Sequence, residues 1–107
     1  MAKYLLKVSY STEGLNGVMK SGGTARVQAV EKMLAGVGGS LESFYFAFGE
    51  DDVIVIADVP DQRSAIAMAA AIGSSGAISS YETVVLLEPS EIDEALNVAV
   101  EYVPPGS

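Results

Sequence analysis

Two apolar runs separated by a short polar turn place the strongest constraint on the fold of this chain. Residues 41–48 and 53–57 are rich in aromatic and β-branched side chains, and residues 49–52 between them read Gly-Glu-Asp-Asp. Aromatic and β-branched residues are enriched in strands because they pack well on a pleated surface. The two runs therefore predict an antiparallel hairpin.

The predicted hairpin is apolar on both of its faces. A two-residue or four-residue turn aligns Phe48 with Val53 and Phe46 with Val55. Phe44 shares their face, and the other face is also apolar, with Tyr45, Ala47, Ile54 and Ile56. An antiparallel sheet that meets water on one side normally alternates apolar with polar residues. We therefore expect helices to cover one face and a second copy of the chain to cover the other.

Strand and helix patterns alternate along the rest of the chain. In order, they predict a strand, a helical region, the two hairpin strands, an alanine-rich helix, a strand and a short helix, at residues 4–10, 14–37, 41–48, 53–57, 60–72, 78–87 and beyond Pro89. Ser-Gly-Gly-Thr at residues 21–24 interrupts the first helical region, and Thr24 is expected to cap its second segment. Ser90 and Asp93 are expected to cap the last helix.

This order corresponds to the ferredoxin-like βαββαβ arrangement with an added C-terminal helix. The predicted fold class is α+β, with a four-stranded antiparallel sheet. A length of 107 residues fits one domain spanning residues 1–107, of which about 100–107 form an extended tail.

Composition excludes several classes of function. Fourteen acidic residues oppose six basic ones, and the net charge of -8 repels the phosphates of nucleic acids and anionic lipids. The apolar stretches are far shorter than the roughly 18 residues that a membrane span requires. We therefore expect neither nucleic acid nor a membrane as a partner. No apolar signal core precedes the first strand pattern, so a cytoplasmic location is expected.

The absence of cysteine and histidine restricts the available chemistry further. Without cysteine there is no disulfide, thiolate nucleophile or sulfur-ligated metal. Without histidine the chain lacks both the usual proton shuttle near neutral pH and the commonest transition-metal ligand. No metal and no cofactor are therefore expected.

One segment has the composition of a small-anion site. Lys20, Gly22, Gly23, Thr24 and Arg26 surround the break in the first helical region. Amide N–H groups at a helix start, glycines that permit close approach and two cations all favour negative charge. The alternative is an ordinary helix break with solvated charges beside it.

The topology is expected to bring two further residues to this segment. Tyr10 ends the first strand and Asp52 begins the strand after the hairpin turn, so both should approach the helix break. Asp52 could satisfy the free N–H groups of the helix itself, which would make the contact structural. It could instead transfer a proton, with Tyr10 or Lys20 assisting, if burial raised its pKa.

Two other groups of residues have structural and functional interpretations. Glu50, Asp51 and Asp52 could bind a hard cation, although three adjacent acids do not supply six converging oxygens, and a solvated turn is the simpler interpretation. Tyrosines could line an aromatic pocket, but tyrosine is equally common at buried edges and interfaces. The tyrosines concerned are Tyr4, Tyr10, Tyr45 and Tyr81.

The chain resembles the GYD-domain family. The resemblance rests on Met1–Tyr10, Gly14, Lys20–Arg26, Phe44–Gly49 and Tyr102–Gly106. It implies the fold of the dimeric α/β-barrel group, which includes cofactor-independent monooxygenases and amino-acid-sensing regulator domains. The family signature of glycine, tyrosine and aspartate falls at residues 49–52, where Asp51 replaces the tyrosine. If that phenol contacts a ligand in the family, this chain either does without it or uses Tyr45 or Tyr10.

Two functions remain open. The first is a homo-oligomeric module that binds a small anionic or aromatic ligand or mediates interactions. The second is a cofactor-independent enzyme, similar to a monooxygenase or an isomerase, acting on a small aromatic or carbonyl compound. A filled interior favours the first, and a cavity with converging Tyr, Lys or Asp groups favours the second.

Overall fold

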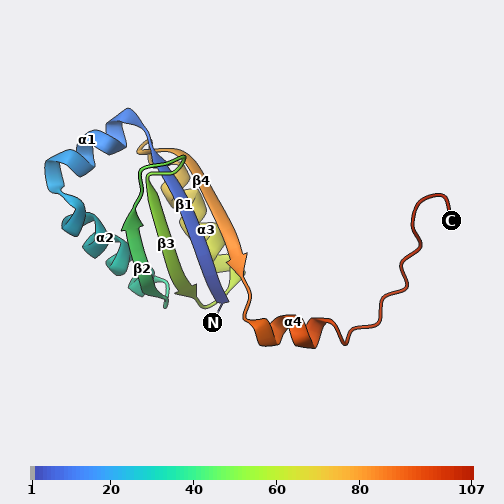
Figure 1. Cartoon of the computed structure of the whole chain (residues 1–107). Helices are drawn as coiled ribbons and strands as arrows, with labels where there is room; N and C mark the ends of the chain where they lie inside the picture. The colour runs from blue at the N-terminus through green and yellow to red at the C-terminus, as the bar shows by residue number, and fades with distance from the viewer. Residues whose placement is uncertain (1) are drawn as a thin grey trace.

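The computed structural model describes residues 2–107 and shows an antiparallel sheet with helices packed against it (Figure 1). In chain order the elements are β1 (Ala2–Tyr10), α1 (Thr12–Ser21), α2 (Gly23–Gly36), β2 (Ser40–Phe46), β3 (Val53–Val59), α3 (Gln62–Gly73), β4 (Ile78–Leu86) and α4 (Pro89–Ala95). The described residues form one four-stranded sheet in the order β2-β3-β1-β4, with antiparallel neighbours. The predicted α+β, ferredoxin-like fold with an added C-terminal helix is confirmed.

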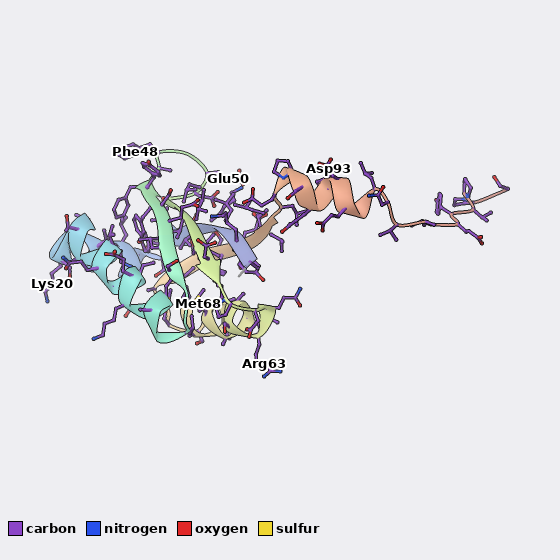
Figure 2. All side chains as sticks on the ribbon, turned by 90° about the horizontal axis from the view of Figure 1, so that it is seen from below. Lys20, Phe48, Glu50, Arg63, Met68 and Asp93 are labelled. Carbon is purple, nitrogen blue, oxygen red and sulfur yellow. The ribbon has the colours of Figure 1, made fainter. Side chains whose placement is uncertain are left out.

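The core lies between the sheet and helices α2 and α3. Strand β3 alternates strictly, and Val53, Val55, Ala57 and Val59 are all buried on the helix-facing side. The same side of β1 contributes Tyr4, Leu6 and Val8, while α2 adds Val30 and Leu34 and α3 adds Ala65 and Met68. Figure 2 shows Met68 between α3 and the sheet. Fully burying an aliphatic side chain contributes about 1.5–3 kcal/mol, so this layer supplies most of the hydrophobic stabilisation.

The predicted pairing register of the hairpin is wrong by two residues. Phe46, not Phe48, pairs with Val53, and Phe44 pairs with Val55. Residues 47–52 form a longer loop, in which the Asp52 backbone bonds to two other segments of the chain. Its N–H donates to the Val8 carbonyl (2.9 Å), and its carbonyl accepts from the Ala47 N–H (2.9 Å). A shift of two keeps each side chain on its face, so the predicted face assignment still holds. Phe48 projects fully exposed from the loop (Figure 2).

The face of the sheet opposite the helices is partly exposed within the described chain. Its centre is apolar and half-buried, and consists of Leu5, Ile54, Ile56, Val84 and Leu86. Ion pairs surround this centre: Lys3 bonds to Glu42 and lies 3.4 Å from Asp58, and Lys7 lies 3.5 Å from Asp51. We call this surface the open sheet face. The expectation that it is covered by a second copy remains a prediction.

The break between α1 and α2 occurs at Gly22, whose φ of 86° lies in the left-handed region that favours glycine. Gly22 is also the N-cap of α2, and no side chain of the described residues caps this helix. The prediction that Thr24 caps it is therefore wrong, because α2 already begins at Gly23 and Thr24 lies in its first turn. Starting α2 at Gly23 allows close packing on β2: a Cβ there would lie 2.9 Å from the Phe46 ring.

Side-chain caps occur at two other helices. The Ser11 hydroxyl accepts from the Gly14 N–H (3.1 Å) at the start of α1, and the Asp61 carboxylate accepts from the Ser64 N–H (2.8 Å) at the start of α3. The Ser64 N–H holds the pKa of Asp61 below its usual value. For α4 the predicted cap at Ser90 is wrong: Glu88 is the N-cap, and its side chain makes no capping hydrogen bond within the described chain.

The C-terminal residues leave the domain. Helix α4 follows β4 and points away from the sheet, and the chain beyond it is extended in both views (Figures 1 and 2). Every residue from Leu87 to Ser107 is exposed. The extended segment therefore begins earlier than the predicted residue 100, at the end of the turn that closes α4.

Gly14 and Gly17 form a matched pair for testing how α1 is attached. A Cβ at Gly14 would lie 1.9 Å from the Ala77 carbonyl oxygen, whereas a Cβ at Gly17 would meet no described atom within 4 Å. We expect Gly14→Ala to lower the free energy of unfolding by about 1–3 kcal/mol through overpacking. Gly17→Ala should raise it by about 0.5–1 kcal/mol because alanine favours the helix. Urea denaturation measures the free energy of unfolding of both variants. Equal changes in the two variants would contradict the close approach at Gly14.

Candidate functional site

A cleft of about 560 Å³ lies where the end of β1 meets α1, α2 and the turn from α3 to β4. Its polar lining residues are few and come from different elements: Tyr10, Glu13, Ser21, Arg26 and Ser75. Apolar walls are provided by Val18, Met33, Ile72 and Ile78. A mostly apolar concavity with a few polar groups is the usual form of a small-molecule site.

The cleft exists because small residues occupy the facing sides of two helices. Gly14, Gly17, Val18 and Ser21 line it from α1 at helical spacing. From α2 and the residue before it the lining residues are Gly22, Ala25, Arg26, Ala29 and Met33, again spaced by three or four. The glycine, alanine and serine residues in these two sets are too small to fill the space between the helices. None of Thr12–Ser21, all of which the structure describes, is buried, so α1 adds nothing to the core.

Helix α1 is instead attached through polar contacts at its start. Ser11 donates its N–H to the Ala77 carbonyl (2.9 Å) and its hydroxyl to the Gly76 carbonyl (2.7 Å). Gly14 permits the helix to approach the same turn closely. One end of α1 is thus fixed against the α3–β4 turn, which closes the cleft on that side.

Asp52 holds the end of β1 in position behind the cleft. Its carboxylate accepts a hydrogen bond from the Tyr10 backbone N–H at 2.9 Å. Its backbone bonds extend the same link to Val8. The predicted approach of Asp52 to Tyr10 is therefore found, but the carboxylate binds the strand and not the free N–H groups at the start of α2. A charge-assisted hydrogen bond of this kind is stronger than a neutral one.

Tyr10 and Arg26 are the principal polar pair of the cleft. Burial raises the pKa of Tyr10 above its ordinary value of 10.0, the Arg26 guanidinium acts in the opposite direction, and the Asp52 carboxylate adds to the rise. The Tyr10 hydroxyl is therefore protonated near neutral pH and can donate a hydrogen bond. Arg26 is half-buried and forms no ion pair with any carboxylate of residues 2–107.

A second, smaller cavity of about 40 Å³ lies beneath the cleft, between the helices and the sheet. Tyr10, Arg26, Met33, Ile72 and Ile78 line both spaces. Tyr81 lines only the smaller one, and its buried hydroxyl finds no hydrogen-bond partner among the described residues. Burial raises the pKa of Tyr81 as well, so it is also a neutral donor near pH 7. The neighbouring Thr83 side chain acts in the opposite direction on the pKa of Tyr81.

The structure separates the sequence-predicted site residues into two groups. Tyr10, Gly22 and Arg26 line the cleft, with Asp52 directly behind Tyr10. Lys20, Gly23 and Thr24 are not among the lining residues. Lys20 is exposed and projects from the outer end of α1 (Figure 2). The proposed role of Lys20 as a second cation at this site therefore has no geometric support.

Sequence reasoning missed the small residues that hollow the cleft and the contribution of the α3–β4 turn. The first could have been found from sequence, because glycine and alanine recur every three or four residues on both sides of Gly22. The second could not, since Ser75 and Ile78 are about 50 residues distant from the helices they face. Their approach depends on β4 pairing with β1.

The acidic turn after β2 does not form a converging cluster. The Asp51 carboxylate pairs with Lys7, the Asp52 carboxylate accepts from Tyr10, and the Glu50 carbonyl accepts from the Ser9 hydroxyl at 3.3 Å. Within residues 2–107 no group of three or more acidic side chains is arranged to hold a metal ion. The described helices include none long and apolar enough to cross a membrane.

The pKa of Tyr10 provides a test of the cleft geometry. Because Arg26 lowers this pKa, Arg26→Met should raise it further, whereas Asp52→Asn should lower it. Since the folded-state pKa exceeds the unfolded one, the stability that Tyr10 contributes is complete below about pH 10 and is lost as the pH rises through the folded-state value. Tyrosinate absorbance titration, with Tyr10→Phe subtracted and Lys32→Met as control, measures the shifts. An unchanged Tyr10 titration in Arg26→Met would contradict the pairing.

The comparison with protein families gives one result. The family model of the GYD domain matches residues 4–96, which extend from within β1 to the end of α4 and include every residue lining the cleft. The segment Tyr102–Gly106, which contributes to the sequence resemblance, lies outside the match. A comparison with curated proteins finds no match. The match covers most of the 107 residues, and the chain therefore belongs to the GYD domain family.

Proposed function

We propose that this chain is a homo-oligomeric domain that binds a small aromatic or carbonyl compound carrying at most one negative charge. The observation that carries the proposal is the cleft of about 560 Å³ in which Tyr10 and Arg26 meet among apolar walls. Its volume lies within the range of roughly 300–1,000 Å³ that is usual for small-molecule sites.

The polar groups determine the chemistry of the ligand. Arg26 offers a planar set of N–H donors that fits a carboxylate or a carbonyl group, and it has no competing carboxylate partner in the described chain. The Tyr10 hydroxyl supplies a neutral donor beside it. Gly22 brings the uncapped start of α2 to the same wall, where amide N–H groups favour partial negative charge.

Two features limit the charge and shape of the ligand. Glu13 lines the outer part of the cleft, and the chain has a net charge of -8, so a polyanion would be repelled. Met33, Ile72 and Ile78 form an apolar wall that suits a ring or a short alkyl chain. A singly charged compound with an apolar body satisfies both conditions.

The oligomeric part of the proposal rests on the open sheet face. Its half-buried apolar centre includes Ile54 and Ile56, and the flanking lysines are already neutralised by Glu42, Asp58, Asp51 and Glu82. Apolar patches rimmed by polar residues mark interaction surfaces. Packing of two such faces against one another would give the dimeric barrel arrangement that the family resemblance implies.

The alternative function, a cofactor-independent enzyme, has less support from the cleft. An enzyme of this kind needs a base with a pKa near the working pH. The pKa values of Tyr10 and Tyr81 both move upward, away from neutrality, so both residues act as donors. Asp52 uses its carboxylate to hold Tyr10. Binding therefore accounts for these groups more directly than proton transfer does.

Ligand binding is tested in two stages. Mass spectrometry of the natively purified protein should detect a retained compound with an apolar body and a single acidic or carbonyl group. Calorimetric titration with benzoate as a probe should then show binding that Arg26→Met weakens by about tenfold to a hundredfold, through loss of a charge-assisted hydrogen bond. Lys32→Met is the control for overall charge. Absence of any retained compound, together with no benzoate binding, would remove the proposal.

Oligomerisation through the open sheet face is tested separately. Light scattering coupled to gel filtration should report a dimer or larger species at micromolar concentration. Ile56→Lys places a charge in the apolar centre and should shift the protein towards monomer, while Ile66→Lys, on the exposed outer side of α3, should not. Circular dichroism checks that both variants are folded. A monomeric wild-type protein would contradict this part of the proposal.

A further inference from the structure

The C-terminal segment has the sequence pattern of a strand but no strand partner. Apolar residues alternate at Leu96, Val98, Val100 and Tyr102, and each is at least 67% exposed. Alternation with a period of two is typical of a strand with one buried face. No backbone hydrogen bond joins residues 99–103 to any other part of residues 2–107. A contiguous row of exposed apolar side chains marks an interaction surface.

The overall dimensions show that this segment is not packed on its own domain. A compact chain of 107 residues has a radius of gyration of about 13 Å, whereas this chain has 17.1 Å. Its accessible surface is 7312 Å², which exceeds by about 1,600 Å² the value for a compact protein of 11.1 kDa. A stable interface needs only about 800 Å² from each partner. The excess is therefore large enough to form one.

The sheet offers a complementary surface at the free edge of β2. This strand is an edge of the four-stranded sheet, and it carries the exposed aromatic residues Tyr45 and Phe46. Edge strands are normally protected by lysine, proline or a covering element, because their unpaired backbone groups attract other strands. In β2, residues 40–46 contain neither lysine nor proline, and the single charge, Glu42, is paired with Lys3.

The C-terminal segment and the helices near β2 differ in charge. The C-terminal residues 88–101 carry five acidic groups, at Glu88, Glu91, Asp93, Glu94 and Glu101, and no basic one. Helix α2, which lies beside β2 in Figure 1, carries Arg26, Lys32 and Glu31, and the adjoining α1 carries Lys20 and Glu13. Complementary charge on the two surfaces steers their association.

We propose that residues 97–103 form an arm that pairs as an added strand with the free β2 edge of a second copy of this chain, which requires the turn hydrogen bonds from Asn97 and Val98 to α4 to open. Strand addition satisfies the backbone groups of both segments and places alternate arm side chains against apolar surface. The exchange is reciprocal, because each copy has one arm and one free β2 edge. This inference rests on the homo-oligomeric part of the proposed function and specifies the segments that meet. It assigns a role in association to residues 97–103, which lie outside the family match at residues 4–96.

Substitutions in the full-length arm test its role in association. Val98→Asp combined with Val100→Asp should raise the dimer dissociation constant by about a hundredfold in analytical ultracentrifugation, because two buried apolar side chains are lost. As a control, Ala99→Asp combined with Ser107→Asp adds the same charge at odd-numbered positions, which do not belong to the apolar row. This double variant should change the dimer dissociation constant little. The arm does not contact its own core, so the thermal stability of the monomeric domain should be unchanged. Equal dimerisation of both double variants would overturn the proposal.

Cross-linking tests which edge receives the arm. The chain has no cysteine, so each single-cysteine variant carries one thiol. Glu101→Cys mixed with Ser43→Cys on β2 should give a heterodimeric product with a short bis-maleimide, whereas Glu101→Cys mixed with Ser80→Cys on β4 should not. A product with Ser80→Cys alone, or with neither, would contradict pairing at β2. If the protein is dimeric but no arm cross-link forms, the arm proposal fails and dimerisation through the open sheet face still stands. If the arm cross-links but benzoate does not bind, the ligand proposal fails and the arm proposal stands.

Discussion

The packing of α2 and α3 onto the helix-facing side of β1 and β3 is the interaction on which the rest of this structure depends. Val53, Val55, Ala57 and Val59 present a continuous apolar row, and Leu34 from α2 is completely buried against this layer. Because two helices suffice to cover the row, α1 is not needed in the core. It is attached through Ser11 and the close approach at Gly14, and it stands away from α2 across a line of small residues. The cleft is therefore a direct consequence of how the core is completed.

The burial of β3 in this core also explains why Asp52 has a structural role. The strand that contains Val53 is fixed by burial, so the residue just before it is held close to the end of β1. There its carboxylate receives the Tyr10 N–H at 2.9 Å, and Tyr10 in turn faces Arg26. The orientation of the cleft tyrosine thus depends on a carboxylate outside the cleft. Removing that carboxylate would change the position of Tyr10 without touching a ligand, which is why Asp52 is a positioning residue and not part of the binding surface.

Much of the fold could be predicted from sequence because its signals are local. The β-branched run at residues 53–57 and the glycines around residue 22 correctly predicted β3 and the helix break. The hairpin register could not be predicted, because it depends on the bonds from Asp52 to Val8 and Ala47, which join three segments. The failed cap at Thr24 has a similar cause. Packing of Gly23 against Phe46 sets the start of α2, and this contact is not visible in the local sequence.

The candidate site was predicted in part for the same reason. Tyr10 was predicted because the end of the first strand meets the broken helix in this topology, whereas Lys20 and Arg26 were both predicted because they flank the break in sequence, and of these two only Arg26 lines the cleft. Lys20 lies on α1 and Arg26 on α2, and the break at Gly22 separates the two helices, so closeness in sequence does not place both side chains in the cleft. Within α2, Ala29 lies three residues after Arg26 and lines the cleft beside it.

The distribution of charge links the two surfaces that remain exposed. Of the six cations, Lys3 and Lys7 are neutralised on the open sheet face, and that face is consequently apolar with a balanced rim. Three of the other four lie on α1 and α2, where the sequence is locally less acidic than the chain as a whole. The proposed arm carries one acidic group, Glu101, and follows the acidic helix α4, so the proposed arm contact and the proposed singly charged ligand would both bring negative charge to this region. The few cations near the cleft are what make both proposals compatible with a chain whose net charge is -8.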